Sequence, residues 1–417
     1  WHVSCASCLR SVKRERVSCC FEMESRCASA AVDAHYHALC SDPAGEQVAA
    51  MSVREAVSLC QDGPPRYGAP REIGHYSILA DGDDFEYADG DVAKRYLRAR
   101  IPFRPMWNLN DGYESAVRAS WISLTPAECL LRWIIRNKGK VVACSTNEVQ
   151  SEGVRTDFIC RRLCFCVLMC TPYKEKTAWR IVASRHRGVV YLHVHPTKKE
   201  VHQYLKERDH CSWDRITYWG VKFHRVMSTS EPGVPPKEDE LVRERDSYNT
   251  VLRGHIGSHT CVISGEVKAV DSSVQCELGS TGSYVEFKTN CLISTEEQRS
   301  TFAKKKLLVW WAQSHLLGVP KGLCGFRHDN GIVMRVQEFD VKTMPDKAKG
   351  LWSEDVCMRF LNDTLNFIKE HVEGDDGRTV FLLKYEPSSC QITCKRLVDP
   401  GKLYSLPDWF LKGIEGC

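Results

Sequence analysis

The sequence predicts a mixed α/β (α+β) fold, in which a single large domain holds mixed β-sheets flanked by helices. Polar and apolar residues alternate over 265–268 and 284–289, which is typical of strands. Residues 179–195 read as two further strands joined by a turn, whereas 361–372 has apolar residues at helical spacing. Hairpins combined with long helices favour a mixed-sheet domain.

The elements can be followed from the turn-rich segment 63–70, which marks the entry into the main domain. A helix is expected over 125–138, because Pro126 suits a first turn and Gly139 suits the end. The strands of 179–195 are expected to turn at Arg187-Gly188. Segment 231–246 has three prolines and dense charge, so a solvated loop is expected there.

The last third of the chain predicts two strands between two helices. The first helix would turn its apolar positions to the core: Leu361, Leu365, Ile368 and Val372. Strands are expected over 378–386 and 391–397, and a short helix over 408–414.

Several aromatic and histidine residues invite a functional interpretation. Trp310 and Trp311 are expected to pack in the core rather than to stack on bases. His315 is expected on a helix surface or at a pocket rim. His193 and His195 would share a strand face, and we expect an edge or surface strand there rather than a metal site.

Composition and cysteine usage indicate a globular intracellular protein. Hydrophobic residues make up 43% of the 417 residues, and the formal net charge of +4 permits an acidic partner without demanding one. No run of about 18 apolar residues predicts a transmembrane helix, so no membrane association is expected. The 22 cysteines often lie in apolar stretches, as small buried hydrophobes do, which favours a reduced protein.

Residues 1–64 form a cysteine-rich N-terminal extension ahead of a main domain over 65–417. We expect a poorly ordered tail with free thiols. The alternative is a zinc site, since thiolates and imidazoles are zinc ligands, although the spacings match no known finger. Its candidate ligands are Cys5, Cys8, Cys19, Cys20, Cys27, His35, His37 and Cys40.

The most informative window carries two acid–lysine pairs on predicted strands. Glu266 and Lys268 would share one strand face, as would Glu286 and Lys288. Such an arrangement suggests a nuclease-type site, where carboxylates hold a divalent cation and a lysine contacts the scissile phosphate.

These residues, with others in the same order, resemble the decapping exoribonuclease (DXO) family of metal-dependent RNA-decapping enzymes. The resemblance covers about residues 70–417 and implies that family's nuclease fold and a nuclear or cytoplasmic location. It rests on residues 71–77, 109–113, 161–162, 171–173, 218–224, 265–268, 286–288, 310–314, 318–320 and 325–327. It implies catalytic positions at Glu266, Glu286, Lys288 and Gln313, and a phosphate-contacting arginine at Arg162.

Two positions depart from the family pattern. His224 stands where the family has glutamate, and Lys268 where it has aspartate. The resemblance makes both direct metal positions, together with Glu286 and the backbone carbonyl of Phe287. A unit charge about 4 Å from a divalent cation is worth roughly 8 kcal/mol at an effective dielectric near 20. An ammonium at Lys268 should therefore repel Mg²⁺ or Mn²⁺, and it offers no oxygen ligand.

Two interpretations of Lys268 stay open. With Arg162, Lys288 and Gln313 it could bind a 5′-phosphate, or it could close the site by pairing with Glu266 or Glu286. The first hypothesis is therefore an RNA 5′-end-binding protein of cap quality control and turnover, a pseudoenzyme without a cofactor.

The alternatives are an active decapping hydrolase or 5′–3′ exoribonuclease and a non-catalytic interaction scaffold. The hydrolase would act on non-standard capped or 5′-phosphorylated RNA and hold Mg²⁺ or Mn²⁺ at Glu286, His224 and the Phe287 carbonyl. Expected partners are an RNA 5′ end, as phosphate or cap nucleotide, and an exoribonuclease protein.

Overall fold

The computed structural model describes residues 42–58, 65–82, 84–118, 126–141, 155–207, 211–237, 239–401, 403 and 406–415. Every candidate zinc ligand of the N-terminal extension lies outside these residues, as does Thr125.

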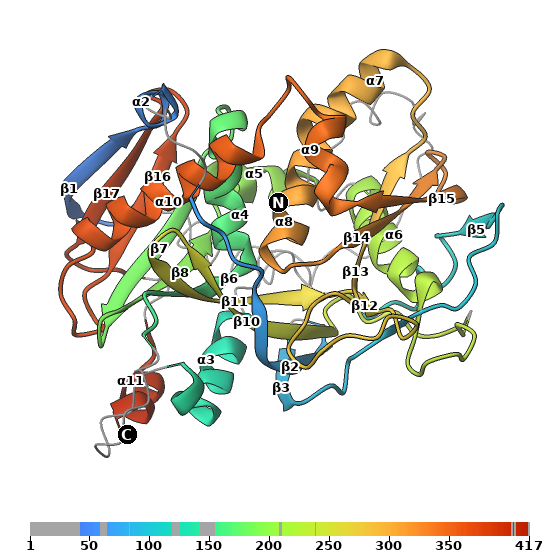
Figure 1. Cartoon of the computed structure of the whole chain (residues 1–417), viewed down its shortest axis with the longest axis horizontal. Helices are drawn as coiled ribbons and strands as arrows, with labels where there is room; N and C mark the ends of the chain where they lie inside the picture. Colours follow the sequence, from blue (N-terminus) through green and yellow to red (C-terminus); the bar gives the residue numbers. More distant parts are fainter. Residues whose placement is uncertain are drawn as a thin grey trace, which may run out of the picture.

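Two mixed sheets organise the described chain, which confirms the predicted fold class (Figure 1). The first has ten strands in the order β1 (Gly45–Ser52), β17 (Gln391–Leu397), β16 (Phe381–Glu386), β7 (Trp179–His186), β8 (Val189–His195), β6 (Phe158–Arg161), β11 (His259–Val267), β10 (Ser247–Ile256), β2 (Arg71–Asp81) and β3 (Asp84–Asp89). The second has seven, in the order β5 (Trp107–Asn108), β15 (Ile332–Asp340), β14 (Lys321–Arg327), β13 (Tyr284–Cys291), β12 (Ala269–Val270), β4 (Tyr96–Leu97) and β9 (Ser228–Thr229).

The helices cover both faces of the sheets. The α-helices are α2 (Val53–Ser58), α3 (Pro126–Arg136), α4 (Arg162–Cys170), α5 (Lys198–Glu207), α6 (Cys211–Met227), α7 (Glu296–Thr301), α8 (Leu308–Leu316), α9 (Met344–Lys347), α10 (Glu354–His371) and α11 (Asp408–Glu415). Short 3₁₀ turns are η2 (Lys138–Lys140), η3 (Thr171–Tyr173) and η5 (Val341–Thr343), and η4 (Phe302–Leu307) is a π-helix leading into α8.

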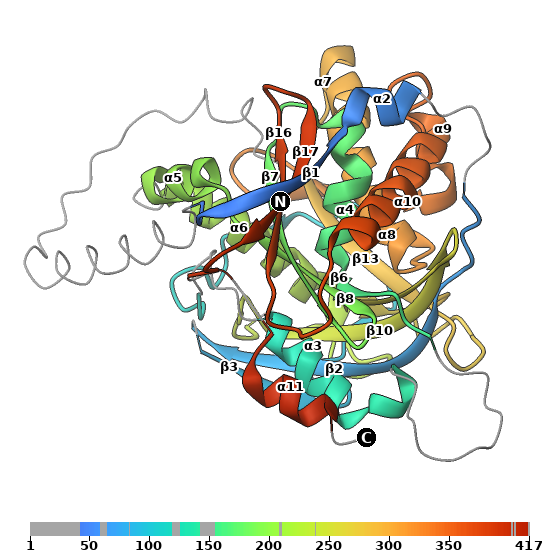
Figure 2. The ribbon, with the colours of Figure 1, turned by 90° about the vertical axis from the view of Figure 1, so that its left-hand side faces the viewer.

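The main core lies between the two sheets and contains α4, α8 and α10. Trp311 on α8 and Phe360 on α10 are fully buried there, among residues of both sheets. Figure 2 shows α3 and α11 on the other side of the first sheet from these helices, where they enclose a second cluster. Helix α6 packs on the second sheet in a third cluster, through Tyr218 and Phe223. The site helices are thus fixed between or against the sheets by apolar burial.

Most predicted elements are confirmed. The helix expected over 125–138 is α3, the late strands are β16 and β17, and the terminal helix is α11. The turn between β7 and β8 has positive φ at both Arg187 (53°) and Gly188 (77°), as a two-residue hairpin loop requires. Trp310 and Trp311 are buried, and Leu361, Leu365 and Ile368 line the core side of α10.

The cysteines of 160–170 behave as predicted. Cys160, Cys164, Cys166 and Cys170 are buried free thiols on β6 and α4. Burial raises the pKa of Cys166 to about 12, so this thiol stays protonated and packs as an apolar group.

The placement of His193 and His195 was wrong. Strand β8 is not at an edge, because it lies between β7 and β6 in the ten-stranded sheet. His195 is fully buried, and burial lowers the pKa of His193 to about 3 and of His195 to about 2. Both rings are therefore neutral core groups.

His315, expected on a helix surface or at a pocket rim, is half-buried. Its ring stacks between Tyr67 (centroids 4.5 Å apart) and Trp311 (4.9 Å), and burial lowers its pKa to about 4. Strand β1 pairs antiparallel with β17, with a register shift between Gln47 and Ala49, so residues 45–52 of the predicted extension are an edge strand of the ten-stranded sheet. Segment 231–246 is mostly irregular, as expected, but Val242 within it is buried.

Candidate functional site

The candidate site lies where the two sheets meet. Strand β11 ends at Val267 in the first sheet, and β12 begins at Ala269 in the second, so Lys268 is the single residue between them (Figure 1). Lys268 thus lies one residue past the end of β11, but its side chain is on the same side as that of Glu266, since the two form an ion pair. The chain changes sheets at this point, which gives Lys268 a place between them.

Close backbone packing brings helix α4 to this junction. A side chain at Gly265 would lie 2.8 Å from Leu317 Cδ1 and 3.2 Å from Arg162 Cβ, so glycine is needed for the approach. Arg162, the first residue of α4, is thereby held against the end of β11. The partial positive charge of a helix N-terminus adds to that of its guanidinium.

Glu286 is the buried anion of the site. Its side chain is 3% exposed, and Oε2 accepts a hydrogen bond from Arg162 Nη1 at 3.1 Å. Oε1 lies 3.4 Å from Lys288 Nζ, on the same face of β13. Burial acts to raise the pKa of Glu286, but Lys288, Arg162 and Lys268 outweigh it and lower the pKa to about 2. The carboxylate is ionised at any physiological pH.

Lys288 links β13 to helix α8. Its Nζ donates to Gln313 Oε1 at 2.7 Å, and Arg162 Nη1 lies 3.4 Å from the Gln313 carbonyl oxygen. Burial lowers the pKa of Lys288, whereas the Glu286 carboxylate acts to raise it. Gln313 thus orients both cations from a helix fixed in the core.

Lys268 forms an ion pair with Glu266, with Nζ 2.6 Å from Oε2. The side chains are 15% and 31% exposed, so the pair lies at the rim of the buried cluster. The internal salt bridge that the sequence left open as one interpretation is therefore formed. Lys268 still acts electrostatically on Glu286 and on Lys288, which places all three in one field.

His224 approaches the cluster from α6. Burial holds the pKa of His224 well below its usual range, and Lys268 and Lys288 act in the same direction. A hydrogen bond with the backbone of Phe287 opposes this shift, and the two rings lie 5.9 Å apart. His224 and the Phe287 backbone, two of the four positions that the resemblance assigns to metal ligands, thus contact each other, and the imidazole is neutral.

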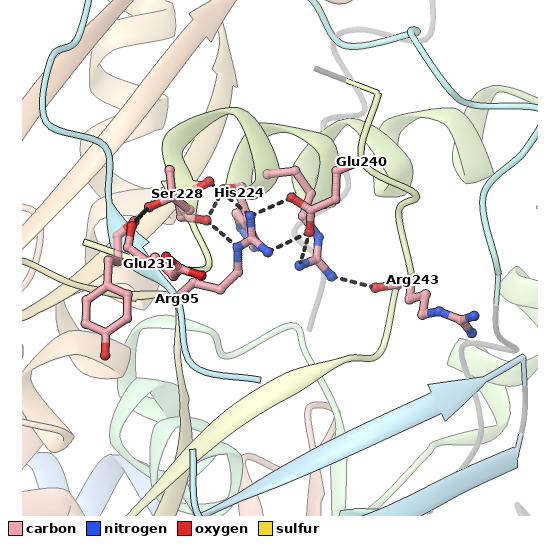
Figure 3. A network of polar contacts seen from close by, with 9 residues as sticks. Arg95, His224, Ser228, Glu231, Glu240 and Arg243 are labelled. Carbon is pink, nitrogen blue, oxygen red and sulfur yellow. Dashed lines mark hydrogen bonds and ion pairs between the residues drawn. The ribbon is translucent and has the colours of Figure 1, made fainter. Parts of the chain in front are cut away.

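A polar network fixes the end of α6 that carries His224 (Figure 3). Arg95 Nη1 and Nη2 donate to the two carboxylate oxygens of Glu240 at 2.6 and 2.8 Å. Arg95 Nε donates to Ser228 Oγ at 2.8 Å, and Ser228 Oγ donates to the carbonyl of His224 at 2.6 Å. Arg225 Nη1 adds a 3.3 Å contact to Glu240. Apart from the charge density of 231–246, no local pattern indicates this network.

The donor set does not suit a hard divalent cation. The cluster holds two carboxylates, Glu266 and Glu286, against three cations, Arg162, Lys268 and Lys288, an excess of one positive charge. In the part of the chain that the structure describes, no three His, Cys, Asp or Glu side chains are grouped to share a metal ion. Mg²⁺ and Mn²⁺ prefer several oxygen ligands, and both carboxylates here already pair with cations.

Chemically, a positive cluster of this kind is suited to a phosphate monoester. Arginine and lysine together can provide charge-assisted hydrogen bonds to its oxygens.

None of the described helices has the length and apolar character to cross a bilayer.

Known proteins are similar to this chain in sequence and in fold. The family model of the RAI1-like PD-(D/E)XK nuclease matches residues 68–411. The decapping and exoribonuclease protein of Xenopus laevis is 30% identical over 372 residues, which cover 87% of this chain and 90% of that protein.

Two solved structures have the same fold. Scheffersomyces stipitis Rai1 in complex with (3′-NADP)⁺ and calcium ion has a TM-score of 0.71 at 18% identity, over 89% of this chain and 100% of that one. Candida albicans Rai1 in complex with pU5-Mn²⁺ has a TM-score of 0.70 at 21% identity, over 85% and 98%. Fold and sequence together define a nuclease-type domain. The chain belongs to the RAI1-like PD-(D/E)XK nuclease family, as the resemblance implied.

Proposed function

We propose that this protein binds the 5′ end of RNA in the junction cluster, which comprises Arg162, Glu266, Lys268, Glu286 and Lys288. We further propose that its metal-dependent hydrolysis is lost or strongly reduced. The observation that carries the proposal is the ammonium of Lys268 at the sheet junction, paired with Glu266 at 2.6 Å. It adds a positive charge where the family has a metal-ligating acid. Repulsion of roughly 8 kcal/mol at about 4 Å, with an effective dielectric near 20, opposes a divalent cation there.

The same charges favour a phosphate. A 5′-phosphate brings two negative charges to a cluster with one excess positive charge, and it can replace Glu266 and Gln313 as acceptor for Lys268 and Lys288. Arg162 stays bonded to Glu286 and keeps that buried carboxylate neutralised. Candida albicans Rai1 was solved with a 5′-phosphorylated oligonucleotide, which supports RNA ends as the ligand class.

A second candidate function is an active decapping hydrolase or 5′–3′ exoribonuclease. Glu286 Oε1 accepts no hydrogen bond from the described residues, and the neutral His224 ring lies beside the Phe287 backbone. These groups could hold Mn²⁺, with Glu266, Lys288 and Gln313 at the retained catalytic positions. Relatives crystallised with Mn²⁺ or Ca²⁺ make this reading worth testing. A non-catalytic scaffold, or docking to an exoribonuclease, is a further proposal.

The deciding experiment compares 5′-monophosphorylated with 5′-hydroxyl RNA of one sequence. Anisotropy in EDTA measures affinity, and gel electrophoresis after incubation with Mn²⁺ measures products, also from non-methyl-capped RNA. The proposal expects tighter binding of the phosphorylated end without metal, and no product. Turnover that disappears in Glu286→Ala would establish the hydrolase instead. Equal affinity for both ends, without turnover, would leave the scaffold.

A further inference from the structure

A nine-residue loop runs from β4, next to β12 in the second sheet, to β5 at the edge of that sheet. Residues 98–106, here called the arginine loop, join β4 to β5 and read Arg-Ala-Arg-Ile-Pro-Phe-Arg-Pro-Met. The loop has three arginines, two prolines and no acidic residue. Its charge is therefore positive throughout.

The tip of the arginine loop exposes an aromatic ring to solvent. Phe103 is 90% exposed, and Met106 and Ile101 are 56% and 37% exposed. A single exposed apolar residue is ordinary, but this ring lies in a loop that also carries exposed arginines, and that combination suits a partner with aromatic faces and negative charge. Arg100 and Arg104 are also exposed, and neither lies within ion-pair distance of an acid among the residues that the structure describes.

The loop is held in place rather than free to collapse on the surface. Pro102 and Pro105 fix their own φ angles near −65°. Arg98 Nη1 donates to the Val226 carbonyl at 2.6 Å, and its guanidinium lies 4.7 Å from the Trp107 ring centroid. At the other end, Trp107 pairs with Val333 of β15.

These anchors connect the arginine loop to the candidate site. Val226 is two residues beyond His224 on the same end of α6. Strand β4, which leads into the loop, pairs with β12 through Tyr96 and Val270, two residues beyond Lys268. The base of the arginine loop is therefore tied, through β4 and the end of α6, to the segments that carry Lys268 and His224.

We propose that the arginine loop binds the single-stranded body of an RNA whose 5′ end occupies the junction cluster. One base stacks on Phe103, while Arg100 and Arg104 contact the flanking phosphates. This inference rests on the proposed function and extends it to a second contact. Aromatic rings between cations are the usual platform for single strands, because every base has a π-face. Three apolar side chains separated by prolines and arginines are a poor core for a protein interface, which buries about 800 Å² on each side.

The test measures the affinity of the full chain for a 5′-phosphorylated dinucleotide and a decanucleotide of matched sequence, in EDTA. Phe103→Ala should weaken decanucleotide binding roughly ten-fold and leave the dinucleotide unchanged, whereas Phe103→Trp should retain both affinities. Arg100→Gln with Arg104→Gln should reduce the salt dependence by about 0.7 for each lost phosphate contact. Leu278→Ala is the matched control, because Leu278 is 97% exposed on another loop.

Equal affinities of wild type and Phe103→Ala for the decanucleotide would overturn the inference and leave the loop as a protein-docking element. The outcome for the proposed function is separate. Loss of 5′-phosphate discrimination in the wild type, with the Phe103 effect intact, would reject the 5′-end site and keep the loop. If the wild type still discriminates the 5′-phosphate while Phe103→Ala has no effect, the 5′-end site is kept and the loop contact is rejected.

Discussion

At the scale of single residues, the character of the site depends on Lys268 and on the pairs around Glu286. Lys268 adds an ammonium at the sheet junction, and Arg162 and Lys288 hold Glu286 as a carboxylate. A buried carboxylate with two cationic neighbours is stable, but its negative charge is no longer free to attract a metal ion.

Lys268→Asp should place an acid at the sheet junction and change the binding preference of the site from 5′-phosphate to Mn²⁺. The change removes one positive charge and adds one negative charge, so Mn²⁺ affinity should rise by at least ten-fold while 5′-phosphate affinity falls. Calorimetric titration with Mn²⁺ and with phosphorylated oligonucleotide measures both. Lys349→Asp makes the same charge change on an exposed turn and should alter neither. Unchanged Mn²⁺ affinity in Lys268→Asp would remove the electrostatic argument.

Glu286→Gln separates the two candidate functions. Without the carboxylate, Arg162 and Lys288 lose their buried counter-charge, and the free energy of unfolding should fall by about 3 kcal/mol. The same two cations then favour phosphate more strongly, so 5′-phosphate affinity should rise and phosphate should recover much of the stability. Denaturation with and without phosphate measures this. Tighter RNA binding fits the proposal, whereas weaker binding would contradict it.

At the scale of elements, the end of α6 is positioned by Arg95, the residue before β4, and by Glu240 in the irregular segment after β9. Arg95 and Glu240 are far apart in sequence, yet their bidentate pair lies against the last turn of the helix (Figure 3). The π-helix η4 precedes α8, the helix that presents Gln313 to Lys288. Both devices set the register of a helix against the sheet that carries Glu286.

Arg95→Met should loosen this end of α6. Glu240 would keep only the longer Arg225 contact, and Ser228 would lose a hydrogen-bond donor. The free energy of unfolding should therefore fall by about 2 to 3 kcal/mol. Hydrogen exchange should quicken in the last turn of α6. Arg243→Ala is the control, because Arg243 contacts Asp81, whose side chain is 85% exposed. Similar losses in both variants would show that the network has no special role.

At the scale of the whole molecule, two sheets share one buried helical layer, and several histidines lie inside as neutral groups. Burial lowers the pKa values of His193, His195 and His315 to about 3, 2 and 4. Unfolded histidines titrate near 6.5. Below that pH the unfolded chain binds protons at these histidines and the folded chain does not. Their contribution to the free energy of unfolding is therefore complete above about pH 6.5 and is lost on acidification.

Acidification from pH 7 to pH 5 should therefore lower the free energy of unfolding. The slope approaches about 1.4 kcal/mol per pH unit for each of these histidines once the unfolded chain is protonated. Chemical denaturation at several pH values measures it. His193→Asn should reduce the slope by one histidine's share, whatever its effect on stability at pH 7. A stability that is flat between pH 6.5 and pH 5 would contradict the assignment.

Local pattern was enough for many elements. Pro126 begins α3, and Arg187-Gly188 forms the turn between β7 and β8. Both features depend on only a few neighbouring residues, so the sequence alone predicts them. The edge assignment of His193 and His195 failed because strand order is set by distant segments. The residues of the junction were found because their order resembles a known family. Arg95 and Glu240 were missed because their pairing joins segments that nothing local connects.

The sequence by itself determined the mixed fold, the family and the two substitutions, His224 and Lys268, because residue type and order are properties of the chain. The tertiary structure decided what those substitutions contact. Lys268 pairs with Glu266 at the point where the chain passes from one sheet to the other, and His224 lies against Phe287 at the end of α6 that the Arg95 network holds. Charges act through space over a few ångströms, and only the folded chain brings Arg162, Glu286 and Lys288 that close.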